Sequence, residues 1–367
     1  MISNIILLIL LIYCCVILSF VLGWYRNQKS KNIESKKYVS IVIAMRNEEN
    51  NVNNIINNFN FQNYPEDKLE LIIVDDHSTD LTLKKAKKCN QKNIKVLSLP
   101  NNLYGKKLAI NFGLQYAVGD IILTSDADCI FQSNWVSTMS SYFNNDNVKL
   151  VAGPVTYSSE ETIFQKFQSL EFYSLIACGA GAIGIKKPIF CNAANMAYSR
   201  DVIKIFNQVT DSKIASGDDV FLLHHLKKTS AKSIKFARDQ KAIVTTSGKE
   251  NTSDFLTQRK RWTAKSASYN DLFTSFVAIL VLSVNLSFLY VVFESFFTKN
   301  YSLLFLFFIV KFICDFLILK PALKFLNKED LVKWILVFEF FYSLYVIFIV
   351  VISFTTSFKW KNRIYKK

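Results

Sequence analysis

The strongest constraint on this chain is the uneven distribution of its apolar residues. Residues 2–21 are almost uninterrupted hydrocarbon, and about 20 such residues suffice to cross the core of a bilayer. No basic residue precedes this run, whereas a cleaved signal peptide begins with basic residues. Five basic residues follow it: Arg26, Lys29, Lys31, Lys36 and Lys37. The pattern predicts a membrane anchor over residues 1–25, with its amino end outside and residue 26 onward in the cytoplasm.

Three further apolar segments lie near the end of the chain, at Leu272–Phe293, Tyr301–Leu319 and Leu331–Phe354. Their lengths favour membrane helices within residues 270–357 over buried core helices. Lysines concentrate between the second and third segments, which predicts a cytoplasmic link there. Three crossings would carry the tail, residues 358–367, to the outside, yet the tail holds five basic residues. The side of the membrane that the tail occupies therefore stays open.

The overall composition excludes several classes of protein. Hydrophobic residues make up 51% of the 367 residues, which excludes intrinsic disorder, and 10 Gly and 5 Pro exclude a collagen-like chain. The 7 cysteines are odd in number and form no Cys-x-x-Cys pair, which argues against a disulfide scaffold or structural zinc. Much of the net charge of +15 lies at membrane edges, where anionic lipid explains it, so no nucleic-acid partner is expected.

Between the anchor and the later apolar segments, residues 38–265 alternate short apolar strands with helix-like stretches. The expected strands are Val39–Ala44, Glu70–Val74, Ile94–Leu97 and Asp120–Thr124, with a helix over Lys106–Ala117 before the fourth. Continuous apolar strands that alternate with helices predict a mostly parallel sheet covered on both faces. Ligands of such sheets bind beyond the carboxyl ends of the strands.

Polar motifs follow these strands at the predicted binding edge. Glu48 follows the first strand, and Asp75-Asp76 ends the second. Gly105-Lys106 opens a helix whose free N–H groups could hold phosphate. Ser125-Asp126-Ala127-Asp128 follows the fourth strand, and two carboxylates so spaced can hold Mg²⁺ or Mn²⁺ against a diphosphate. Taken singly, an Asp-x-Asp is as often a surface turn, and Asp75-Asp76 as often a helix cap.

Two more motifs lie downstream. Ser216-Gly217-Asp218-Asp219 precedes an apolar helix, and its acidic pair is also a plausible helix cap. Gln258-Arg259-Lys260-Arg261-Trp262 lies just before the second apolar segment, where a basic cluster with an interfacial tryptophan also suits any membrane protein. The sequence of each motif alone leaves these alternatives open.

In this order the motifs resemble those of the membrane-bound family 2 glycosyltransferases, which include polysaccharide synthases and lipid glycosyltransferases. The resemblance covers roughly residues 38–265 and the arrangement of an anchor before them and helices after them. It implies an α/β fold: a GT-A-like, Rossmann-type, mostly parallel sheet domain with one N-terminal and about three C-terminal transmembrane helices.

The resemblance also implies roles for individual residues. The residues that would bind the nucleotide sugar are Ala44, Glu48, Asp75, Asp76, Lys106, Asn111 and Asp126. Asp126 and Asp128 would hold the divalent metal, Mg²⁺ or Mn²⁺, and Asp219, the second acid of a pair with Asp218, would be the catalytic base. The residues that would meet the acceptor and diphosphate are Asn195, Gln258, Arg259, Arg261 and Trp262.

The implied reaction is the inverting transfer of a hexose from a nucleotide sugar, expected to be a UDP-sugar, to a membrane-associated lipid or glycan. A single displacement assisted by a base requires no covalent nucleophile. Two alternatives remain, namely a processive polysaccharide synthase of the same family and a non-catalytic membrane scaffold that binds nucleotide or glycan. The expected location is the inner (plasma) membrane, as a multi-pass protein of the cell envelope with a cytoplasmic catalytic domain and membrane lipids as partners.

Overall fold

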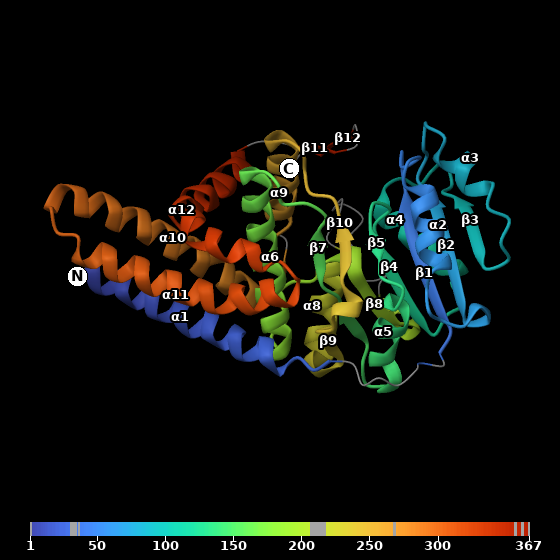
Figure 1. Cartoon of the computed structure of the whole chain (residues 1–367), viewed down its shortest axis with the longest axis horizontal. Coiled ribbons are helices and arrows are strands. Elements are labelled where there is room, and N and C mark those ends of the chain that lie inside the picture. The colour runs from blue at the N-terminus through green and yellow to red at the C-terminus, as the bar shows by residue number, and fades with distance from the viewer. Residues whose placement is uncertain are drawn as a thin grey trace. The chain divides into compact units, whose positions relative to one another are not determined.

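The computed structural model describes residues 2–29, 35, 37–205, 218–266, 269–355, 358–360 and 363–365. They form two compact units (Figure 1). The sheet unit comprises Asn27–Ser158 and Phe190–Ser247, and the helical unit comprises Met1–Arg26, Ser159–Ile189 and Gly248–Lys367. Two segments expected in the catalytic domain, 159–189 and 248–265, therefore group with the apolar helices, because their helices pack against those helices.

A seven-stranded sheet in the order β3-β2-β1-β4-β8-β6-β9 forms the centre of the sheet unit. Strands β1 to β4 are parallel to their neighbours in that group, β8 is antiparallel to both β4 and β6, and β9 is parallel to β6. The strands of this sheet are β1 (Val39–Met45), β2 (Leu69–Asp75), β3 (Ile94–Ser98), β4 (Ile121–Ser125), β6 (Leu150–Ala152), β8 (Met196–Ser199) and β9 (Ile234–Phe236). The second sheet contains β5 (Ile130–Phe131), β10 (Val244–Thr246) and β7 (Val155–Tyr157).

The parallel half of the sheet forms where the apolar runs predict it. Every residue of β2 and β4 is buried, as expected for strands that are flanked by strands on both sides. Met45 lies opposite Asp75, and Ile43 lies opposite Ser125. The carboxyl ends of β1, β2 and β4 therefore meet at one edge, which brings the loops that follow them together.

One close contact sets the position of helix α4 (Lys106–Tyr116) on the parallel strands. A Cβ atom on Gly113 would lie 2.7 Å from Val42 of β1 and 2.9 Å from Val74 of β2, so only glycine permits this approach. The helix thereby places Lys106, its first residue, at the carboxyl edge of the sheet. The other helices of the unit are α2 (Val52–Asn60), α3 (Thr82–Lys87), α5 (Trp135–Ser141) and α8 (Asp218–Ser230).

The helical unit contains four helices that are long and apolar enough to cross a membrane, one before the sheet unit and three after it. They are α1 (Ile2–Arg26), α10 (Leu272–Thr298), α11 (Ser302–Phe325) and α12 (Val332–Thr355). Helices α1, α10 and α11 run alongside one another (Figure 1). The unit also contains α6 (Ile163–Gly184), α9 (Thr252–Ser266) and the short strands β11 (Phe358–Trp360) and β12 (Arg363–Tyr365). The predicted four apolar helices are confirmed.

Glycines join α1 to α6 at a backbone-to-backbone contact. A Cβ atom on Gly23 would lie 1.9 Å from the carbonyl oxygen of Gly181, and one on Gly184 would lie 1.9 Å from that of Gly23. Gly181 and Gly184 belong to a Gly-x-Gly-x-x-Gly spacing that in other proteins opens a dinucleotide-binding helix. Here the spacing lies inside α6 and serves helix packing.

Charged side chains within the apolar helices pair with one another. Lys311 of α11 is 2% exposed and contacts both Asp315, one turn further along, and Glu339 of α12. The Tyr13 hydroxyl of α1 donates a hydrogen bond to Asp315. Because an unpaired charge in hydrocarbon is costly, this cluster fixes which faces of α1, α11 and α12 meet.

Candidate active site

Asp75 ends β2, and Asp76, the next residue, connects that strand to the start of α4. Both are 4% exposed. Oδ1 of Asp76 accepts a hydrogen bond from the N–H of Gly105 at 3.0 Å, and Nη1 of Arg46 lies 3.9 Å from its Oδ2. Gly105 has φ 102°, a conformation that favours glycine, and it immediately precedes Lys106. Asp76 thus fixes the turn that presents Lys106.

Asp75 keeps one carboxylate oxygen available for a ligand. Its Oδ2 accepts a hydrogen bond from the N–H of Ser78 at 3.2 Å. Its Oδ1 is buried, and no group among the described residues donates to it; the same is true of Oδ1 of Asn111 in α4. A buried acceptor without a donor costs about 1–3 kcal/mol. Oδ1 of Asp75, at the carboxyl end of β2, is therefore a candidate acceptor for an N–H or O–H group of a ligand.

The first loop, after β1, is hydrogen bonded to the second, after β2. The N–H of Glu48 donates to Oγ1 of Thr82 at the start of α3, at 2.8 Å. Oε2 of Glu48 accepts from Nδ2 of Asn51 at 2.7 Å. Ala44 is half-buried near the end of β1, one residue before the loop. These contacts tie the loop after β1 to the start of α3, and Ala44 lies opposite Val74, the neighbour of Asp75, in the sheet.

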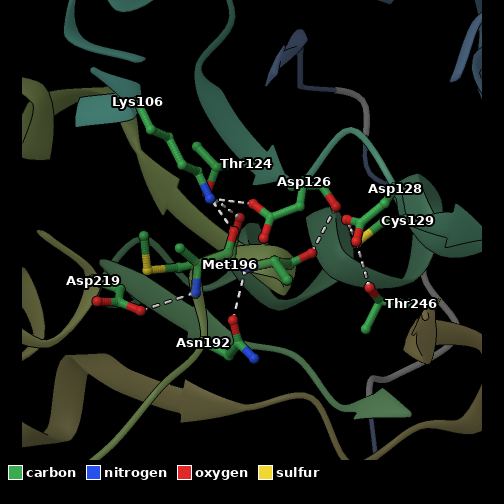
Figure 2. Close-up of polar contacts among 12 residues, drawn as sticks. Lys106, Thr124, Asp126, Asp128, Cys129, Asn192, Met196, Asp219 and Thr246 are labelled. Atoms are coloured by element: carbon green, nitrogen blue, oxygen red, sulfur yellow. Dashed lines mark hydrogen bonds and ion pairs between the residues drawn. The ribbon is translucent and has the colours of Figure 1, made fainter. Parts of the chain in front are cut away.

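Lys106, the first residue of α4, meets Asp126, which follows β4 (Figure 2). Its ammonium group forms an ion pair with Asp126, and both side chains are about one-third exposed. Burial lowers the pKa of Lys106, but the negative charge of Asp126, followed by that of Asp219, outweighs it and raises the pKa. Asp126 is therefore the direct partner of Lys106, and Asp219 contributes only through its charge.

Asp128, the second acid of the Asp-x-Asp pair, lies in a region of concentrated negative charge. Partial loss of hydration and the charge of Asp126 raise its pKa, and Glu48 adds to this effect. A hydrogen bond from Oγ1 of Thr246 at 3.1 Å opposes the shift. A bound cation would relieve the repulsion, so the two aspartates suit the chemistry of Mg²⁺ or Mn²⁺. No group of three metal-ligating side chains is found in the described part of the chain, so other ligands would have to come from the substrate or water.

Asp219 is held beside the end of β4 by the loop at residues 191–195. Its Oδ2 accepts a hydrogen bond from the N–H of Ala193 at 3.1 Å, as Figure 2 shows. The same loop is fixed to β4, where Oγ of Ser125 donates to the carbonyl oxygen of Ala194 at 2.6 Å. Asp219 is half-buried in the first turn of α8. Ser216, Gly217 and the side chain of Asp218 lie outside the described residues.

Asn195 has a structural environment. It is fully buried, and its Nδ2 donates to the carbonyl oxygens of Pro154 and Ala242 at 2.7 and 2.8 Å. Its Oδ1 accepts from Nε1 of Trp135 at 3.0 Å. The side chain is thus enclosed and hydrogen bonded at both ends, which does not suit the contact with an acceptor that the resemblance implied. We assign it to the packing of the loop beneath Asp219.

The Gln-Arg-Lys-Arg-Trp motif lies on α9, in the helical unit. Arg259 is 2% exposed and forms a forked ion pair with Glu171 of α6. Gln258, Arg261 and Trp262 are half-buried. Glu171 and Thr246 were not identified from the sequence, because neither belongs to a motif and their partners lie 88 and 118 residues away. Only the folded pairing of α6 with α9, and of β10 with β5, reveals them.

Comparison with known proteins completes the description of the sheet unit. Residues 40–206 match the family model of "Glycosyl transferase family 2". This segment belongs to glycosyl transferase family 2. Glycosyltransferase AglE of Haloferax volcanii is 26% identical over 208 residues, which cover 55% of this chain and 65% of that protein. The poly-beta-1,6-N-acetyl-D-glucosamine synthase of Staphylococcus aureus is 27% identical over 148 residues, which cover 40% of this chain and 35% of the synthase.

A similar fold is also found among solved structures. The mannosyltransferase PcManGT from Pyrobaculum calidifontis, solved in complex with GDP-Man and Mn²⁺, matches 93% of this chain and 99% of its own with a TM-score of 0.58 and 13% identity. Together with the strand order this confirms the predicted GT-A-like, mostly parallel α/β fold. The chain matches less than two-thirds of the length of either curated relative.

Proposed function

We propose that this protein transfers a hexose from a UDP-sugar to a membrane-associated lipid or glycan, with inversion at the sugar carbon. The observation that carries the proposal is that the loop at Ala193-Ala194 joins Asp219 to the end of β4: the N–H of Ala193 donates to Asp219, and the carbonyl oxygen of Ala194 accepts from Ser125, the neighbour of Asp126. Asp126 and Asp219 are separated by 92 intervening residues, and their carboxylates could hold a charged ligand and accept a proton.

Asp219 is proposed as the general base. The acceptor hydroxyl must lose its proton as it attacks the sugar carbon, and a carboxylate within reach contributes roughly 10²- to 10⁴-fold. The N–H groups of Ala193 and Val220 fix the Asp219 carboxylate at 3.1 and 2.9 Å. The nucleoside diphosphate leaves from the opposite side of the sugar ring, so one displacement inverts the configuration.

Asp126 and Asp128 are proposed to hold a divalent cation, whose role when bound is to neutralise the charge that develops on the departing diphosphate. The fit rests on the two carboxylates, and the pKa of Asp128 is raised first by partial desolvation and then by the charge of Asp126. Lys106, in the first turn of α4 and paired with Asp126, is proposed to contact the diphosphate.

The preference for uridine is proposed from Asp75. Uracil presents one N–H between two carbonyl groups, and Asp75 has one buried oxygen, Oδ1, without a donor. Guanine presents adjacent N–H groups that would favour two free carboxylate oxygens, and Oδ2 of Asp75 already accepts a hydrogen bond from Ser78. The solved structure of PcManGT is a complex with GDP-Man, so the identity of the base distinguishes the proposal from that neighbour.

The acceptor is proposed to lie in the membrane. Four apolar helices could anchor the enzyme as a multi-pass protein of the plasma membrane, with the sheet unit in the cytoplasm. There the donor is water-soluble and the acceptor reaches the site from the lipid phase. A processive synthase of the same family is the second candidate, supported by the similarity to the staphylococcal synthase.

A donor screen tests the proposal. Full-length protein in detergent would be incubated with Mn²⁺, UDP- and GDP-sugars and a membrane lipid extract, and the products identified by mass spectrometry. We expect a single sugar added to a lipid from a UDP donor; a ladder of products would favour the processive synthase. Nucleotide binding without any transfer would favour the scaffold.

A substitution separates the base from the binding site. Asp219→Asn should reduce transfer at least 10²-fold while the affinity for UDP in Mn²⁺ stays within about threefold. Asp146→Asn, at an exposed aspartate of the same unit, is the matched control and should retain full activity. Normal turnover by Asp219→Asn would remove Asp219 from the role of base.

A further inference from the structure

We propose that α12 lies within the membrane without crossing it, so that both of its ends, and the tail that follows, are on the side that carries the sheet unit. Its 24 residues are about 36 Å long, which would suffice for a crossing. The contacts at its two ends favour a path that begins and ends on one side. This path through the membrane is independent of the proposed function.

Two helices of the helical unit are joined to the sheet unit by only a few residues. Glu160, just before α6, follows Ser158 of the sheet unit by two residues, which is at most about 7 Å of chain. Thr252, the first residue of α9, follows Ser247 of the sheet unit by five residues. The amino-terminal ends of α6 and α9 therefore mark the side of the helical unit from which the chain reaches the sheet unit. We call this the proximal side.

The start of α12 lies on the proximal side. Lys328, four residues before α12, forms an ion pair with Glu160 at 2.6 Å. In the first turn of α12, the ring centre of Trp334 lies 5.5 Å from the ammonium group of Lys166. Because Lys166 belongs to the first turn of α6, both contacts are made at the end of α6 that is joined to the sheet unit.

The second half of α12 stays beside the same two helices. The hydroxyl of Tyr345 donates to Glu171 of α6 at 3.1 Å, and its ring stacks on that of Phe255, with 5.9 Å between the ring centres. Phe255 lies in the first turn of α9. The strand after α12, β11, also contacts α9. In Figure 1 the end of α12 is near α9 and far from the turn that joins α10 to α11. The chain thus leaves α12 on the side where it entered.

Lipid nevertheless covers one face of α12 along its whole length. Leu336 near its start and Phe354 near its end are 46% and 58% exposed, and other large apolar residues are exposed between them. So continuous an apolar face belongs in hydrocarbon rather than in water. The opposite face packs on the bundle, where Ser343 donates a hydrogen bond to Asn285 of α10 at 2.7 Å. The partner of the exposed face is therefore the acyl chains of the leaflet on the proximal side.

The charge of the tail agrees with this path. Residues 358–367 contain five basic residues, no acidic residue and three aromatic residues. Basic residues next to membrane helices concentrate on one side of the membrane, and tryptophan and tyrosine concentrate at the interface. A third crossing would place the tail opposite the basic residues that follow the apolar run at residues 2–21. Without that crossing both basic segments lie on one side, where anionic lipid attracts them.

Protease access to tags in sealed membrane vesicles tests the path. A short peptide that a sequence-specific protease cuts would be added after Lys367 of the full-length chain. In separate proteins it would be placed before Met1, or between Asn90 and Gln91 in an exposed loop of the sheet unit. Inside-out and right-side-out vesicles from a bacterial host would be treated with the protease, and cleavage followed by immunoblot.

We expect the tail tag and the sheet-unit tag to be cut in the same kind of vesicle, at least tenfold more than in the other kind. The tag before Met1 should be cut in the opposite kind, because α1 crosses the membrane once. A tail tag that is cut together with the tag before Met1 would show that α12 crosses and would overturn the proposal. This comparison of the two terminal tags suffices if the insertion prevents the sheet unit from folding.

Neutralising the tail separates packing from charge. The variant would carry Gln at all five basic positions of the tail, namely 359, 361, 363, 366 and 367. Its tag should stay on the proximal side, because the contacts of Trp334 and Tyr345 remain. A tag that changes side would show that charge alone sets the path, which would overturn the proposal. None of these measurements needs a donor or an acceptor, so a protein without transferase activity would refute the proposed function and leave the path of α12 unaffected.

Discussion

The Lys106→Met substitution should change the affinities for cation and nucleotide in opposite directions. Without ligand, the Lys106 ammonium group pairs with Asp126 and is also attracted by Asp219. A divalent cation at Asp126 must displace this ammonium group, whereas a diphosphate would gain a contact from it. Removal of the amine therefore strengthens the binding of the cation and weakens the binding of the diphosphate.

The structure sets the size of both effects. The side chains of Lys106 and Asp126 are 35% and 36% exposed, so solvent limits the ion pair to at most about 1 kcal/mol. Its loss should strengthen the binding of Mn²⁺ alone by up to about fivefold. A hydrogen bond to a charged phosphate contributes about 1.5–3 kcal/mol, so UDP in saturating Mn²⁺ should bind about 10- to 150-fold more weakly.

Isothermal titration at constant ionic strength measures both constants. Mn²⁺ would be titrated into the free protein, and UDP into the protein saturated with Mn²⁺. Lys84→Met, at an exposed lysine of α3, controls for the loss of one positive charge. Weaker binding of Mn²⁺ together with unchanged binding of UDP would refute the arrangement of competing cations.

Two further predictions concern stability. Because the pKa of Asp128 is raised in the fold, its ionised form destabilises the protein at neutral pH, and this penalty is lost as the pH falls from the folded pKa through the unfolded value near 4. In EDTA, Asp128→Asn should therefore raise Tm at pH 7.5, by no more than about 2 °C because the residue is exposed. The gain in Tm should vanish near pH 4. A gain that grows on acidification would contradict the raised pKa of Asp128. Gly113→Val would force α4 away from Val42 and Val74 and should lower the free energy of unfolding by about 1–3 kcal/mol, seen as a Tm lower by several degrees. Gln115→Val, on the exposed side of the same helix, should leave Tm unchanged. Equal Tm values for the two variants would show that the helix can move without cost.

The fold was predictable where one physical signal dominates. Apolar runs longer than a bilayer core gave the four candidate membrane helices, and short apolar strands gave the parallel sheet. The grouping of Asp75, Lys106 and Asp126 followed from the rule that parallel strands end at one edge. Asp219 joined them through the order of motifs, and the structure shows the bond to Ala193 that holds it.

The remaining features depend on contacts between segments far apart in the chain. Thr246 is the last residue of an ordinary strand, and only the pairing of β10 with β5 brings it to Asp128. Asn195 has the same residue type whether it meets a substrate or fills a core, and its three internal hydrogen bonds decide between these. The grouping of α6 and α9 with the apolar helices was likewise hidden, because α6 has no apolar stripe that distinguishes it from a core helix.

The glycine contact between α1 and α6 has a practical consequence for anyone who wants a soluble fragment. The backbones of α1 and α6 are in direct contact at Gly23, Gly181 and Gly184. The first helix is therefore a packed part of the helical unit as well as a candidate anchor. Cutting the chain after Arg26, or replacing the first helix with an unrelated hydrophobic leader, would strip α6 of its closest neighbour. Expression trials should keep this helix and solubilise the whole bundle.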